Sequence, residues 1–181
     1  VTLYTRNGQP YGLGTPHPLP TGLGAPRQAA FAGRTTFVPL ADAARSVVVR
    51  TRALDASGAG FDDEFAVHAS ATERLSGVVL AGAADAYVTV VPRDPAAAGG
   101  RVVRLTGAFD FSSRHASLPT TPVVTSTTAR PNVLCAGASP RELFAGGWVL
   151  QGSDRRAALF RLDLDAVPGE LLPAWVDTET N

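Results

Sequence analysis

Two residues of this sequence could supply a catalytic nucleophile, and neither stands in a recognisable catalytic motif. The one cysteine, Cys135, lies in the apolar stretch NVLCAGA, and Ser139 lies in GASPR. A thiol or hydroxyl needs a histidine within hydrogen-bonding reach, and Ser139 also lacks the second glycine of a nucleophile elbow. The histidines, His17, His68 and His115, are too widely spaced to form a metal-ligand pair. We therefore expect a packed thiol and no enzyme, with a hydrolase that uses Cys135 or Ser139 beside a histidine as the alternative.

Acidic residues gather in two stretches, FDDEF at 61–65 and DLDAVPGE at 163–170. Calcium requires about six to eight oxygen atoms that converge on one point, and loops of β-sandwiches can supply them. Neither stretch has the spacing of an EF-hand, and neither has a motif for paired catalytic carboxylates. We interpret both as solvated turns or strand faces, and we expect no metal and no cofactor.

The stretch GLGTPHPLPTGLGAPR, residues 12–27, holds nearly the same six letters twice, ten positions apart. A dinucleotide-binding loop needs G-x-G-x-x-G between a strand and a helix, so that backbone N–H groups face the phosphates. The third glycine is absent from both copies, and Pro16 and Pro26 each remove a donor. The pattern therefore argues against phosphate binding and favours an extended segment.

Residues 1–34 form an expected arm that is rich in structure breakers. It contains the prolines at 10, 16, 18, 20 and 26 and the glycines at 8, 12, 14, 22, 24 and 33. Proline favours extended polyproline geometry and glycine adds no side chain to a core, so the arm has little to bury internally. We expect it to contact neighbouring subunits through Leu3, Tyr4, Tyr11, Leu13, Leu19, Leu23 and Arg27.

Charge and composition narrow the class of partner. The net charge is zero, with 16 basic and 16 acidic residues, and the isoelectric point is about 7.0. Nucleic-acid binders usually have a basic face or an isoelectric point above about 9, so we expect no nucleic-acid partner. No apolar run approaches the roughly 18 residues of a membrane span, so we expect no membrane insertion. Residues 1–41 carry three arginines and no acid, whereas residues 162–181 carry five acids and no arginine, so these ends could attract each other.

Alternation with period two predicts an all-β body over residues 35–181, an antiparallel sandwich or barrel. In AALFRLDLD, 157–165, the even positions 158 to 164 are apolar, and we expect them to face the core. In TERLSGVVLAG, 72–82, Glu73 and Arg74 open an apolar run that fits a helix or a strand, and we interpret 78–80 as strand. SPRELFAGG, 139–147, predicts a short helix capped by Ser139 and Glu142, with Gly146 as its stop. Trp148 is expected in the core.

These expectations favour a non-enzymatic structural protein of a large assembly, joined to copies of itself or to other subunits through the arm. A virion component, such as a phage capsid decoration or tail protein, is the setting that this architecture suggests by analogy. The alternative is a secreted or surface β-sandwich that binds carbohydrate through Trp175, Asp163 and Asp165, and we expect Trp175, which lies near the acidic tail, to be exposed.

Overall fold

The computed structural model describes residues 28–32, 35–41, 45–53, 60–81, 85–108, 120–165 and 169–178 of the 181-residue chain. All regular elements within these ranges are strands, which confirms the all-β expectation. Residues 1–27 of the expected arm lie outside the described ranges. The last part of the expected arm, residues 30–32, forms a strand of the body.

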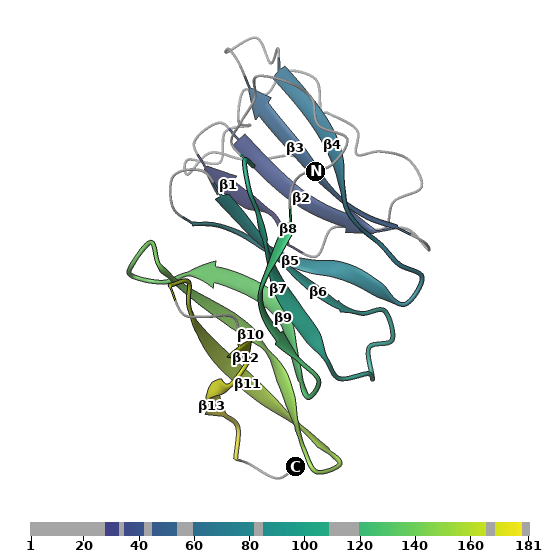
Figure 1. The fold of residues 1–181 in the computed structure, drawn as a ribbon, viewed down its shortest axis with the longest axis vertical. Coiled ribbons are helices and arrows are strands. Elements are labelled where there is room, and N and C mark those ends of the chain that lie inside the picture. Colours follow the sequence, from purple (N-terminus) through teal and green to yellow (C-terminus); the bar gives the residue numbers. More distant parts are fainter. Residues whose placement is uncertain are drawn as a thin grey trace, which may run out of the picture.

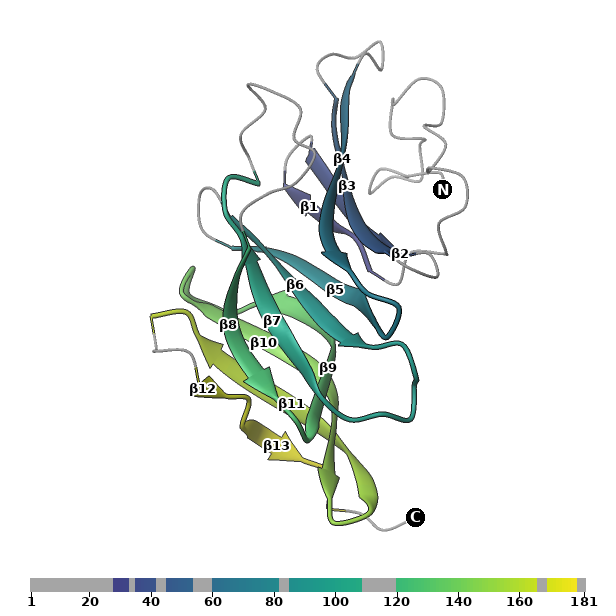
Figure 2. The same cartoon turned by 45° about the vertical axis from the view of Figure 1, so that its right-hand side comes forward.

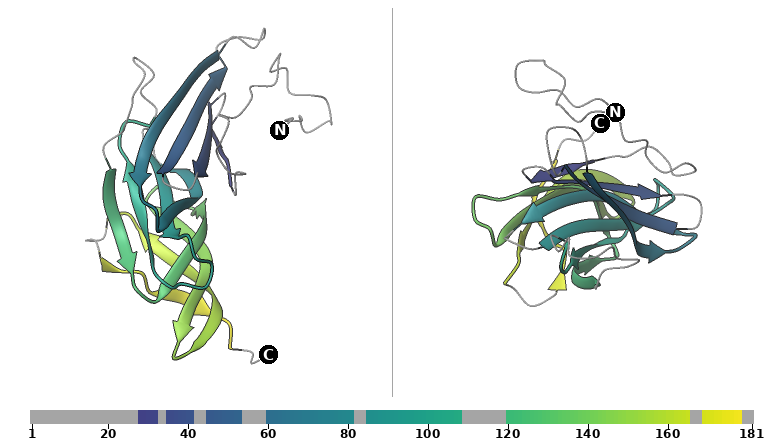
Figure 3. Two further views of the ribbon diagram at one scale, coloured as in Figure 1. Left: turned by 90° about the vertical axis from the view of Figure 1, so that its right-hand side faces the viewer. Right: turned by 90° about the horizontal axis from the view of Figure 1, so that it is seen from above.

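The strands form three sheets, which follow one another along the longest axis of the molecule (Figures 1 and 3). The upper sheet is antiparallel with order β1-β2-β3-β4: β1 (Ala30–Ala32), β2 (Thr35–Ala41), β3 (Arg45–Ala53) and β4 (Gly60–Ala69). The central sheet has order β12-β8-β7-β6-β5: β5 (Glu73–Ala81), β6 (Asp85–Pro92), β7 (Gly100–Leu105), β8 (Thr120–Ser126) and β12 (Gly169–Glu170). The lower sheet is antiparallel with order β13-β11-β10-β9: β9 (Ala129–Ala136), β10 (Glu142–Gln151), β11 (Asp154–Asp163) and β13 (Pro173–Val176). In the central sheet β12 pairs with β8 in parallel, and the other pairs are antiparallel.

The central sheet lies between the upper and lower sheets (Figure 2), and a separate hydrophobic core lies on each of its faces. Towards the upper sheet, Val88 and Leu105 pack with Phe37 and Val48. A strand that is buried on both faces has apolar residues at nearly every position. In β6, only Thr89 of the six consecutive buried residues is polar, and its Oγ1 accepts a hydrogen bond of 2.6 Å from the Gly77 N–H. This explains why the apolar run in 72–82 fits a helix as well as a strand, and the expected strand at 78–80 is confirmed within β5.

The second core lies between the central and lower sheets. It joins Tyr87, Val102 and Val124 of the central sheet to side chains of β9, β10 and β11. Phe160 is fully buried there, and Ala158 and Leu162 lie beside it, as the alternation in 157–165 predicts. The other side chains of β11 consequently point away from the central sheet.

The expectation of a helix at 139–147 is wrong. The chain makes a tight turn there, with the Glu142 N–H donating to the Ser139 carbonyl and the Gly137 N–H donating to the Glu142 carbonyl. The serine and glutamate that suggested a helix cap therefore close the turn of the hairpin that the strands 129–136 and 142–151 form. Pairing of β10 with β9 and β11 on both sides supplies more backbone hydrogen bonds than a two-turn helix could, and Gly146 lies in the middle of that strand.

Candidate interaction surface

The outer face of the lower sheet, which points away from the central sheet, carries a row of exposed apolar side chains. Opposite residues of paired strands share a face, and the register aligns Val133, Gly146, Leu159 and Trp175 across β9, β10, β11 and β13. Val133 is 47% exposed, Leu159 39% and Trp175 55%. We call these four residues the apolar row. Strands lie about 4.8 Å apart, so the row spans roughly 14 Å.

Two aromatic side chains flank the row on β10. Phe144 and Trp148 are half-buried and stand two positions before and after Gly146, so all three share the outer face. Trp148 was expected in the core, and this expectation is wrong, because the register puts Ala145 and Val149 on the inner face instead. The Arg155 guanidinium lies 5.3 Å from the centroid of the Trp148 ring and covers part of it.

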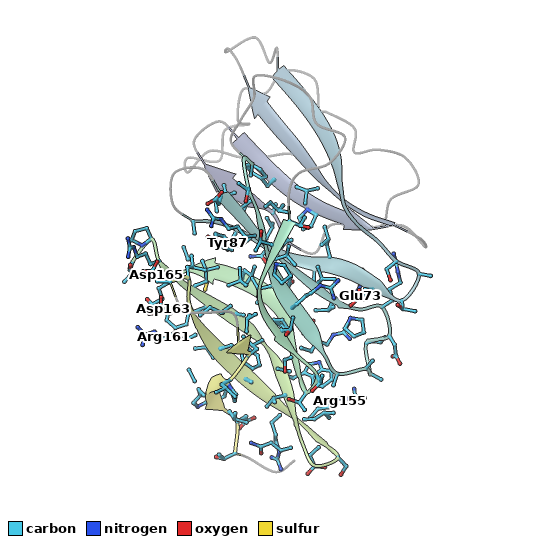
Figure 4. All side chains as sticks on the ribbon, in the orientation of Figure 1. Glu73, Tyr87, Arg155, Arg161, Asp163 and Asp165 are labelled. Atoms are coloured by element: carbon cyan, nitrogen blue, oxygen red, sulfur yellow. The ribbon has the colours of Figure 1, made fainter. Side chains whose placement is uncertain are left out.

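Charged residues border the outer face at the C-terminal end of β11, which is the end opposite to Arg155. Figure 4 shows Arg161, Asp163 and Asp165 together at that end. Arg161 is paired with Glu142, and Arg141 Nη1 lies 2.6 Å from Asp165 Oδ2. Asp163 Oδ1 accepts a hydrogen bond of 3.0 Å from the Asp165 N–H, which fixes the turn. The apolar row is thus bordered by a polar rim.

Gln28, the first described residue, joins the central sheet to the lower sheet. Its Oε1 accepts hydrogen bonds of 3.1 Å from the N–H groups of Val78 on β5 and Leu134 on β9, and its Nε2 donates to the Leu134 carbonyl at 2.6 Å. The side-chain amide therefore takes the place of a backbone peptide between two strand edges. Leu134 is the neighbour of Val133, so the arm reaches the body beside one end of the apolar row.

A second charged cluster lies where β6 begins and β7 ends, in the interior of the central sheet. Arg104 donates to Asp85 Oδ2 from Nε at 2.9 Å and from Nη2 at 2.5 Å, and this bond raises the pKa of Arg104. Burial raises the pKa of the neighbouring Tyr87 phenol, against the opposing effect of Arg104. The phenol stays neutral and the guanidinium charged at ordinary pH, so the cluster is an ion pair beside a core tyrosine.

The structure separates the candidate catalytic residues. Cys135 is exposed on β9, not packed as expected, and Ser139 lies in the β9–β10 turn, whereas His68 belongs to β4 of the upper sheet. The histidines at 17 and 115 and the seven contact residues of the expected arm lie outside the described ranges. The described residues include no group of three or more His, Cys, Asp and Glu that could hold a metal ion. They also include no helix long and apolar enough to cross a membrane.

Only part of the expected sugar site comes together. Trp175 is exposed as expected, and Asp163 lies on the same face. However, Asp163 stands four residues along β11 from Leu159, the partner of Trp175, which is roughly 13 Å at about 3.3 Å per residue. The two aspartates therefore belong to the polar rim and not to the surroundings of Trp175.

Sequence reasoning missed Val133 and Leu159 as surface residues of interest. The alternation in 157–165 predicts Leu159 on the solvent-exposed side of its strand, together with Arg161 and Asp163. A large apolar residue among charged ones on that side is the sequence signal that could have identified it. The alignment of Leu159 with Trp175 and Val133 depends on pairing between distant strands.

A scan against protein-family models found no matching family, and searches of curated proteins and of solved structures found no match either.

Proposed function

We propose that this protein is a non-enzymatic structural subunit that assembles with copies of itself, and with other subunits, through its arm and the outer face of its lower sheet. The apolar row carries the proposal. Three of the four large exposed hydrophobic side chains of the described residues, Val133, Leu159 and Trp175, lie in this row. Contiguous apolar surface with a polar rim is the usual anatomy of a protein interface.

The setting that we propose is a virion, as a capsid decoration or tail component. An extended arm on a compact β body suits such a role, because the arm can tie each subunit to the next. Imaging of native particles with an antibody against the full chain would test this setting.

Self-association should depend on the apolar row. We expect the double variant Leu159→Ser, Trp175→Ser to raise the dissociation constant of self-association by at least about tenfold, because buried tryptophan and leucine side chains dominate interface energies. Sedimentation velocity of the full chain over a range of concentrations measures this. Leu172→Ser is the matched control, since Leu172 is 69% exposed but lies outside the row. Equal effects of the two changes, or a monomeric wild type, would contradict the proposal.

A carbohydrate-binding module, secreted or at a surface, is the second candidate, and the exposed ring of Trp175 favours it. Both tryptophans of the chain, Trp148 and Trp175, lie on the outer face, so intrinsic fluorescence reports its occupancy. If this candidate holds, a glycan array read with and without calcium should give a ligand whose titration changes the fluorescence. Trp175→Ala should then weaken binding by at least about tenfold, and a silent array would dismiss the candidate.

A further inference from the structure

Residues 12–27 and the outer face of the lower sheet have complementary chemistry. The segment holds two Gly-Leu-Gly-x-Pro motifs, at 12–16 and 22–26. We propose that the apolar row of one copy binds a Gly-Leu-Gly-x-Pro motif from the arm of a neighbouring copy. This inference rests on the proposed function and names the contact by which the subunits join.

Aromatic side chains make the outer face suited to a proline-rich ligand. Extended proline-rich segments dock on aromatic surfaces, since they lose little entropy when they are bound. The face presents Trp175, with Phe144 and Trp148 beside the row. Gly146 contributes no side chain at the centre, so a leucine that is itself flanked by glycines can approach the sheet between Leu159 and Val133.

The dimensions of the motif and the row agree. Five residues in polyproline geometry extend about 15 Å at about 3.1 Å per residue, and the row spans roughly 14 Å. The motifs begin ten residues apart, which is about 31 Å, so one row accepts one motif at a time.

The charges of the two partners are also complementary. Residues 1–27 contain Arg6 and Arg27 and no acidic residue. At the rim of the outer face, Glu142 and Asp165 are paired with Arg161 and Arg141, and the ion pairs among the described residues leave the carboxylate of Asp163 without a cation. Opposite charges at the rim favour encounter and fix orientation more than they add affinity.

A mixing experiment with full-length variants tests the inference. The face variant carries Leu159→Ser and Trp175→Ser, and the arm variant carries Leu13→Ser and Leu23→Ser. Leu172→Ser and Pro18→Ser are the controls, because Leu172 lies outside the row, and Pro18 lies between the two motifs and is not one of the expected contact residues of the arm. Circular dichroism and thermal unfolding establish that all four variants are folded, and sedimentation velocity at micromolar concentrations gives their association.

We expect each double variant alone to associate at least about tenfold more weakly than the wild type, and the controls to associate normally. An equimolar mixture of the face and arm variants should form one-to-one complexes, because the face variant retains an intact arm and the arm variant retains an intact row. This complementation occurs only when the arm of one copy binds the face of another.

Other outcomes overturn the inference in distinguishable ways. If the arm variant associates like the wild type while the face variant does not, two faces pair directly, and the assembly function stands without the arm contact. If the wild type is monomeric and the arm variant alone shows greater acrylamide quenching of its tryptophans, the arm covers the row of its own chain. A monomeric wild type without that difference removes both the assembly function and the arm contact.

Discussion

Replacement of Arg130 with methionine is expected to lower the free energy of unfolding by at least about 3 kcal/mol. A hydrogen bond from a charged donor contributes a net of about 1.5–3 kcal/mol, and this side chain makes several of them. The Arg130 side chain is 2% exposed and lies inside the loop between β6 and β7. Its guanidinium donates to the carbonyls of Asp94 at 2.6 Å, Pro92 at 2.7 Å and Ala97 at 2.8 Å, and to Asn132 Oδ1 at 3.2 Å. Methionine fills similar space but leaves these acceptors without their donor. Urea unfolding of the full chain measures the loss.

Arg141→Met is the matched control for this change. Arg141 is 72% exposed in its pair with Asp165, and exposed ion pairs contribute at most about 1 kcal/mol. Arg130→Lys should lie between the two variants, since a lysine ammonium retains the charge but cannot serve all the acceptors of a planar guanidinium. Equal stabilities of Arg130→Met and Arg141→Met would mean that water replaces the guanidinium in the loop.

The local sequence pattern was sufficient to predict the buried side chains where a strand has one solvent-exposed face and one buried face. The alternation of 157–165 predicted which side chains of β11 are buried, because that strand lies on an outer sheet with one side exposed. It was insufficient for β5, since a strand between two cores has no polar side to set its period. The three-sheet arrangement therefore could not be derived from period two alone.

The helix prediction at 139–147 was also wrong because non-local contacts decide the structure of that segment. Ser139 and Glu142 fit a capping box by spacing, but the same two residues close the turn between β9 and β10. Gly146 fits a helix stop, yet it stands in the middle of β10, in register with Val133 and Leu159. Spacing within one segment cannot show which distant strand will lie beside it.

For the candidate interaction surface, the sequence could predict a single exposed residue but not how the residues are aligned across strands. An exposed Trp175 was predicted from its position near an acidic tail, but the row that it completes requires the register of four strands. No local pattern predicted the role of Gln28, because the sequence does not distinguish a glutamine that bridges two strand edges from any other polar residue of the arm.

The second prediction with a large expected effect concerns Gly147, where β9 and β10 approach each other closely. A Cβ atom at this position would lie 1.9 Å from the Arg130 carbonyl oxygen and 2.9 Å from its carbon. Both are backbone atoms next to a register shift between Gly146 and Gly147, so no rotamer change can relieve the overlap. We expect Gly147→Ala to lower the free energy of unfolding by about 3 kcal/mol, at the upper end for overpacking, as measured by urea unfolding.

The neighbouring glycine is the control, since the two changes add the same methyl group one residue apart. At Gly146 a Cβ atom would meet only Val133 Cγ2, at 3.0 Å, which is the end of a side chain that is 47% exposed and can turn aside. Gly146→Ala should therefore change the free energy of unfolding by less than about 1 kcal/mol, helped by the lower entropy of alanine in the unfolded chain. If the two variants are equally stable, β9 and β10 do not approach as closely at Gly147 as described, and the Arg130 backbone is not held against β10.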